Sequence, residues 1–177
     1  MKLFTRLAFV QILVSAVITG SALASPPKPT ESVFRVSSKG PLATINAYSG
    51  LNTEKAAITG HIYSKNAREY CDRDPGSITT KYGGRLTLSQ CINDILKSEK
   101  GRKYIISAAC SYGTVRLSWP QQPGQADGRY KLRERRPRTG YNDHFWLDQA
   151  TGSIVDNSEA GGGGIVNESF AMLCPGF

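Results

Sequence analysis

Four cysteines, Cys71, Cys91, Cys110 and Cys174, constrain the fold of this chain more than any other feature of its sequence. In an exported chain, an even number of cysteines predicts a disulfide framework, here of two bonds, for which three pairings exist. A zinc site of four thiolates is the alternative, but the cysteines lie too far apart in sequence to form the closely spaced pairs that zinc sites use. We therefore expect two disulfides and no metal site.

The start of the chain indicates that it is exported. Lys2 and Arg6 precede an apolar run from Leu7 to Ile18, and the small residues of Ala22-Leu23-Ala24 follow directly before Ser25. This is the layout of a secretory signal peptide. A helix needs about 20 apolar residues to cross a bilayer, and this run is shorter. We expect residues 1–24 to be removed after Ala24, leaving an exported protein without a transmembrane span that is periplasmic or secreted.

The rest of the chain has the length of one domain and a moderate positive charge. Residues 25–31, SPPKPTE, are rich in proline and predict a flexible lead-in, so we place a single domain at 32–177. The formal charge is +8, and removal of Lys2 and Arg6 with the signal peptide leaves +6. Such an excess favours contact with anionic surfaces, but by itself it does not identify a partner.

Three segments show the apolar periodicity of helices: 64–76, 87–101 and 165–174. In the second segment, Thr87 and Gln90 form the pattern of a capping box in front of an apolar stripe. Cys71 and Cys91 each lie on the apolar face of a predicted helix, and two neighbouring helices can bring these faces together. We therefore expect the pair Cys71 and Cys91, which leaves Cys110 to pair with Cys174.

Seven short segments have the period-two pattern of β-strands: 32–37, 42–48, 104–110, 114–119, 130–135, 144–148 and 153–156. The later strands follow one another with short connections, which predicts an antiparallel meander. The expected fold class is therefore α+β: an antiparallel β-meander sheet with two or three helices, stapled by two disulfides.

A basic hairpin is the strongest candidate for a binding site. Strand alternation places Lys131, Arg133 and Arg135 on one face, with Tyr130 and Leu132 on the other. In the following strand, we expect Phe145 and Leu147 to point inward. The candidate surface therefore consists of Lys131, Arg133, Arg135, Arg136, Arg138, His144 and Trp146. Arginine binds carboxylate or phosphate in bidentate fashion, and tryptophan supplies a flat apolar anchor.

Two alternatives stay open for this hairpin. Its charged residues can simply line the solvent side of an edge strand, where they prevent sheet-to-sheet aggregation. A one-residue bulge can also invert the alternation, because a shift of one residue moves every side chain to the opposite face. In that case Trp146 is buried and Phe145 is exposed.

Enzyme chemistry has little support in the sequence. His61 and His144 are the only histidines, and cysteines in disulfides cannot act as nucleophiles. The chain also lacks the motifs of serine hydrolases, zinc peptidases and phosphate-binding loops. We therefore expect no catalytic residue and no cofactor. The pair Asp143-His144 offers the one alternative, in which His144 is the general base of a small hydrolase that acts on the cell envelope.

These observations favour an exported, non-enzymatic binding or inhibitor-like module. The expected partner is an anionic macromolecule or a protein in the cell envelope, bound by the basic hairpin, and not a specific nucleic acid. Besides the hydrolase, a second alternative is a structural or assembly component of an envelope complex, with the proline-rich lead-in as a tether.

Overall fold

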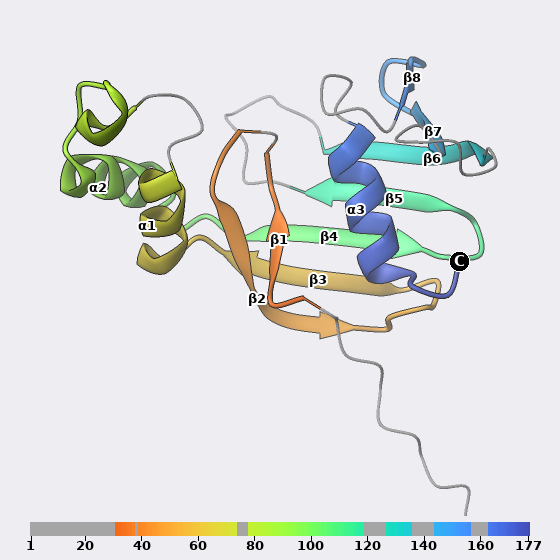
Figure 1. Ribbon diagram of the computed structural model, residues 1–177. Coiled ribbons are helices and arrows are strands. Elements are labelled where there is room, and N and C mark those ends of the chain that lie inside the picture. The colour runs from red at the N-terminus through yellow and green to blue at the C-terminus, as the bar shows by residue number, and fades with distance from the viewer. Residues whose placement is uncertain (1–30, 38, 74–77, 119–126, 136–143, 157–162) are drawn as a thin grey trace, which may run out of the picture.

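An eight-stranded antiparallel sheet organises the part of the chain that the structure, a computed structural model, describes: residues 31–37, 39–73, 78–118, 127–135, 144–156 and 163–177. The strands lie in chain order from β1 to β8, so the sheet is the expected meander (Figure 1). Because strands dominate, the fold is α+β only in a loose sense. The expected signal peptide, 1–24, and nearly all of the lead-in lie outside the described residues.

Every strand pairs antiparallel with the next along the chain, as expected where short connections join consecutive strands. The strands are β1 Val33–Arg35, β2 Leu42–Ser49, β3 Ala56–His61, β4 Tyr104–Ala109, β5 Thr114–Ser118, β6 Gly128–Arg135, β7 His144–Asp148 and β8 Ile154–Val155. The helices are α1 Ser64–Arg73, α2 Leu88–Ser98 and α3 Gly163–Leu173, with a short 3-10 helix at Thr80–Tyr82.

Strand β3 is the element that the sequence pattern did not reveal. It lies between β2 and β4, and Ala56 and Ile58 are fully buried. Alanine and glycine are poor strand formers, so AAITGH carries a weak strand signal. The small residues are required by packing, because a Cβ atom on Gly60 would lie 2.5 Å from the ring of Phe34 and 2.3 Å from the carbonyl oxygen of Thr44.

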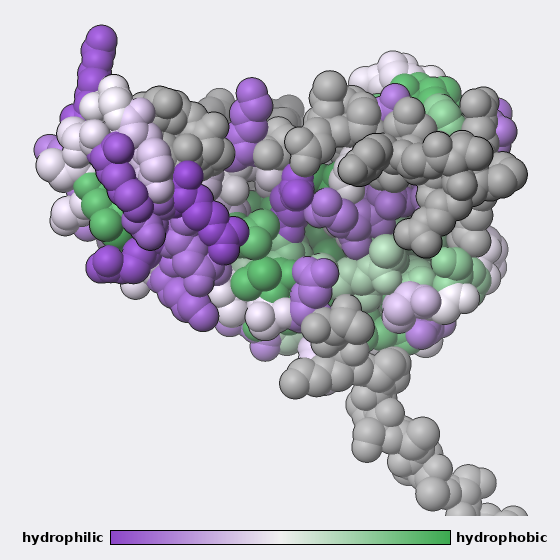
Figure 2. All heavy atoms as spheres, viewed as in Figure 1, coloured by the Kyte–Doolittle hydropathy of each residue, from purple (hydrophilic) through white to green (hydrophobic). Residues whose placement is uncertain are grey.

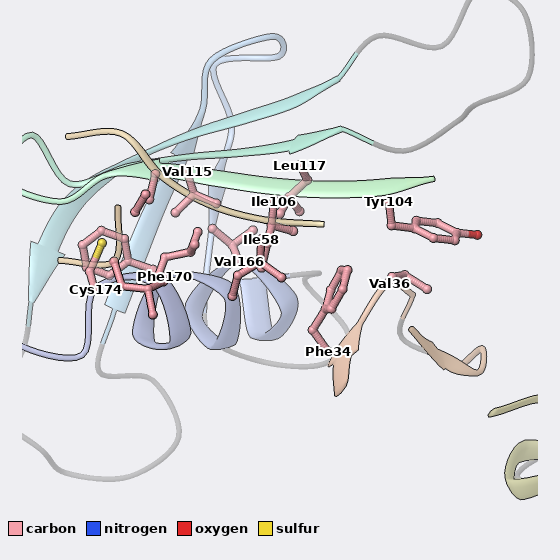
Figure 3. Close-up of a cluster of buried hydrophobic side chains, with 14 of the residues drawn as sticks. Phe34, Val36, Ile58, Tyr104, Ile106, Val115, Leu117, Val166, Phe170 and Cys174 are labelled. Atoms are coloured by element: carbon pink, nitrogen blue, oxygen red, sulfur yellow. The ribbon is translucent and has the colours of Figure 1, made fainter. Parts of the chain in front are cut away.

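Helix α3 covers one face of the sheet and closes the hydrophobic core. Val166, Phe170 and Leu173 are buried on its sheet-facing side. Figure 3 shows Val166 and Phe170 pointing toward Ile58 of β3 and Val115 of β5. The core therefore lies between α3 and the middle of the sheet, and the opposite face of the sheet is not part of it.

Both expected disulfides are confirmed. Cys110, after β4, is bonded to Cys174, after α3, with a Cα–Cα distance of 5.6 Å. Cys71 of α1 is bonded to Cys91 of α2, with a Cα–Cα distance of 6.1 Å. The first bond fixes α3 to the sheet, and the second joins two helices, as their apolar periodicity predicted.

Helices α1 and α2, Ser64–Arg73 and Leu88–Ser98, form a helical arm at one end of the sheet (Figure 1). The expected capping box is present, since the Gln90 N–H donates to Thr87 Oγ1 at 3.2 Å and the Thr87 N–H donates to Gln90 Oε1 at 2.9 Å. Cys91 is the one fully buried residue of α2. Figure 2 shows hydrophilic residues gathered over this end of the molecule, so the arm contributes little to the main core.

Because the helical arm contributes little to the main core, a hydrogen bond and the arm's own disulfide help to hold it in place. Tyr104, the first residue of β4, donates its hydroxyl to the carboxylate of Glu99, which follows α2. Burial raises the pKa of Tyr104 to about 12, so the hydroxyl keeps its proton at neutral pH. The arm is thereby attached to the sheet at both of its ends, through the chain leaving β3 and through this contact beside β4.

The two disulfides should stabilise different parts of the molecule. Replacing Cys110 and Cys174 by alanine should lower the free energy of unfolding by about 4 kcal/mol, and replacing Cys71 and Cys91 by about 3 kcal/mol, because the second bond closes the shorter loop. Amide hydrogen exchange should show lost protection in α3 for the first variant and in the helical arm for the second. Equal loss in both regions for both variants would contradict this assignment.

Candidate functional site

The register between β6 and β7 determines which side chains of the basic hairpin face the solvent. Leu132, a residue packed against the core, lies directly opposite Trp146, so Trp146 and not Phe145 is on the core side of β7. The next pair joins Glu134 to Phe145, so Arg133 is an extra residue without a partner across the ladder. This β-bulge changes the alternation of β6 only after Leu132.

Trp146 is therefore not a surface anchor, and the expected orientation of β7 is wrong. Its side chain is fully buried and packs edge-on against Phe170 of α3, with 5.3 Å between the ring centroids. Phe145 and Leu147 point to the other side of the sheet and are partly exposed. The inversion follows from the register, in which Trp146 lies opposite Leu132, and an indole buries more apolar area against α3 than the phenyl ring would.

His144 also leaves the basic surface. It lies two residues before Trp146 and thus on the same side of β7, with 6.5 Å between the two rings. Lys131 and Arg133 are exposed as expected, and Arg135 is placed by its backbone pairing with His144. Arg136 and Arg138 lie outside the described residues. The predicted surface is therefore divided. Lys131 and Arg133 of β6 are exposed to solvent, whereas His144 and Trp146 of β7 lie on the side that faces α3.

Two arginines that the sequence reasoning did not include complete the exposed surface. Arg116 of β5 lies directly opposite Arg129 of β6, and Thr114 lies opposite Lys131. We call Arg116, Arg129 and Lys131 the basic face. All three are exposed on the side of the sheet that faces away from α3. The signal for Arg116 was present in TVRLS, where Val115 and Leu117 alternate with it as core residues.

The basic face borders a shallow hollow of about 410 Å³. The hollow forms beside the end of the neighbouring strand β4, where the side chains on this face, Ser107 and Ala109, are small. Its polar lining residues are Glu54, Ser107, Thr114, Arg116, Arg129 and Gln149. Hydroxyl and amide groups beside two guanidinium groups can donate hydrogen bonds to an anion that lies on the sheet.

One carboxylate is built into the basic face. Asp127 Oδ2 accepts a hydrogen bond from Arg116 Nε at 2.8 Å, and this bond lowers the pKa of Asp127. In the described part of the chain, no carboxylate is ion-paired with Arg129 or Lys131. Like charges directly opposite each other destabilise a sheet. Asp127 offsets the charge of Arg116. The net positive charge of the basic face therefore comes from Arg129 and Lys131.

The described residues hold no cluster of metal ligands, and their two histidines lie on different strands. Among them, no group of three or more His, Cys, Asp or Glu side chains is placed to hold a metal ion. His61 Nδ1 lies 2.7 Å from Asn46 Oδ1 on β2, whereas His144 is on β7, so the two histidines belong to separate parts of the sheet. On the face away from α3, this sheet presents exposed cations to an external molecule.

A scan against protein-family models and searches of curated proteins and of solved structures found no match for this chain. In the described ranges, no helix has the length and apolar character needed to cross a membrane. The function must therefore be argued from the geometry of the chain itself.

Single substitutions in β7 test its orientation. Trp146→Ala should lower the free energy of unfolding by about 3–5 kcal/mol, because it removes a fully buried aromatic side chain from the core. Leu147→Ala, the matched control on the opposite face, should cost about 1 kcal/mol, because this leucine is partly exposed. Urea denaturation of both variants measures the difference. A larger loss for Leu147→Ala would mean that the strand faces the other way.

Proposed function

We propose that this protein is an exported, non-enzymatic module that binds an anionic macromolecule through the basic face. The observation that carries the proposal is the direct opposition of Arg116 and Arg129 on an exposed sheet surface, with Lys131 on the same side. Asp127 balances the charge of Arg116, whereas Arg129 and Lys131 form no ion pair in the described part of the chain, so their charges are available to a partner.

The spacing of the cations suits a partner with several negative charges. Residues two apart on a strand are about 7 Å apart, which is the separation of Arg129 and Lys131 along β6. Residues opposite each other on neighbouring strands are about 5 Å apart, as are Arg116 and Arg129. A chain of phosphate or carboxylate groups that crosses β5 and β6 can therefore contact all three cations in sequence. Arg133, exposed at the bulge, extends this set.

The basic face is also held in place before binding. Arg116 is fixed by its hydrogen bond to Asp127, and the strands that carry the cations are anchored from behind by the core under α3. A surface that needs no rearrangement loses less conformational entropy when it binds. Most of the binding energy of such a surface is electrostatic, and it should therefore decrease with increasing ionic strength.

Location outside the cytoplasm agrees with this function. Two disulfides, with no free cysteine among the described residues, suit the oxidising conditions of the periplasm or the extracellular space. Anionic polymers and acidic proteins of the cell envelope are available there, and a chain that keeps a formal charge of +6 without Lys2 and Arg6 is attracted to them. We place the protein in the periplasm or in the secreted fraction.

Retention on an immobilised sulfated polysaccharide tests the proposal. The variant with Arg129→Gln, Lys131→Gln and Arg133→Gln should elute at a clearly lower salt concentration than the unaltered protein. Its plot of log Kd against log salt concentration should be less steep by about 2, since each lost contact reduces the slope by somewhat less than one unit. The melting temperature should stay the same, because the three side chains are exposed.

The matched control removes the same net charge elsewhere. Lys65, Lys97 and Lys100 are exposed on or beside the helical arm, and their replacement by glutamine should leave the elution close to that of the unaltered protein. If the control variant loses as much retention as the basic-face variant, the binding reflects net charge alone and the proposal fails.

A further inference from the structure

We infer that a groove between α1 and the β1–β2 connection is a second site, which binds a small organic anion with an apolar or aromatic body. This groove has a volume of about 340 Å³. It lies beside the helical arm, because four of its lining residues belong to α1, and it shares no lining residue with the basic face. The inference is therefore independent of the function proposed above.

Positive charge dominates the lining of the groove. Arg35 comes from β1, Lys39 from the β1–β2 connection and Arg73 from the last turn of α1, whereas Glu69 is the one carboxylate. Glu69 is also 3.9 Å from the ammonium group of Lys65, which lies outside the groove. In the described parts of the chain, neither Lys39 nor Arg73 forms an ion pair. Cations from three separate segments thus converge on one cavity.

Arg35 has a fixed position in this set. Its Nε atom is 3.2 Å from the Glu168 carboxylate of α3, and its side chain is 29% exposed. Arg35 also lines the groove, where its charge adds to the positive potential. Lys39 and Arg73 are the more exposed cations and provide most of the attraction for an anion.

The remaining lining explains why the ligand needs an apolar part. Pro41 and Leu42 contribute aliphatic surface at the start of β2, and the ring of Tyr70 contributes an aromatic surface from α1. All three are partly buried. Ligand pockets usually combine apolar walls with a few polar groups that orient the ligand, and their volumes are about 300–1,000 Å³. This groove is at the small end of that range and cannot enclose a folded partner.

The walls of the groove are held in register by polar contacts. Tyr70 donates its hydroxyl to the carbonyl oxygen of Lys39 at 2.8 Å, which links α1 to the β1–β2 connection. Asn66 is buried, and its Oδ1 accepts from Thr44 Oγ1 of β2 and from the Tyr63 N–H, both at 2.9 Å. The Cys71–Cys91 bond steadies the same helix. The cavity is therefore a preformed feature of the fold.

Isothermal titration of the disulfide-bonded protein with phenyl phosphate and with phenylacetate tests this inference. At least one of these aryl anions should bind saturably with a Kd below about 1 mM. Inorganic phosphate, which lacks the apolar body, and benzyl alcohol, which lacks the charge, should each bind at least tenfold more weakly. The preferred aryl anion distinguishes a phosphate ligand from a carboxylate ligand.

Variants assign the binding to the groove. The double variant Lys39→Gln, Arg73→Gln should weaken the binding of the aryl anion by tenfold or more, with an unchanged melting temperature because both side chains are exposed. The charge-matched control Lys97→Gln, Lys100→Gln should bind like the unaltered protein, because both side chains are exposed and neither lines the groove. So should the variant with Arg129→Gln, Lys131→Gln and Arg133→Gln, which removes the proposed polymer contacts only.

Three results would overturn the inference: no saturable binding of either aryl anion, equal affinity for inorganic phosphate, or a loss of binding in the variant of β6 and not in the groove variant. None of them bears on retention by the sulfated polysaccharide, so the groove and the basic face can fail separately.

Discussion

The packing of α3 against one face of the sheet is the contact on which the rest of the structure depends. Val166, Phe170 and Leu173 close the core that the meander alone would leave open to water. A single antiparallel sheet with both faces in water has no place to bury its apolar residues. The Cys110–Cys174 bond holds this helix in place, and the short connections hold the strands in order.

One-sided cover has a direct consequence for function. Because α3 protects only one face, the other face of β5 and β6 presents polar and charged side chains to the solvent. That face can display Arg116, Arg129 and Lys131 together without disturbing the core. The helical arm is stabilised differently, by its own disulfide and by Tyr104, and its docking beside β2 creates the groove. The two proposed sites thus have separate structural supports.

The sequence predicted the helices, the two disulfides and the meander order, because each depends on local patterns. The capping box of α2 and the apolar faces of α1 and α2 can be recognised without tertiary information. Strand β3 was missed, because its small residues are selected by the approach of Phe34 and Thr44, which are distant in sequence. For the binding surface, the exposure of Lys131 and Arg133 was anticipated, whereas Arg116 and Arg129 lay outside the segment considered.

Trp146 marks the boundary between what local sequence determines and what only the tertiary structure decides. The sequence by itself determined that residues 144–148 form a strand with two chemically different sides. It could not determine which side is buried, because HFWLD has a large apolar residue on each. The register that places Trp146 opposite Leu132 and the edge-on contact with Phe170 decided the matter. The contact with Phe170 depends on the position of α3, which the Cys110–Cys174 bond fixes across 64 residues of chain.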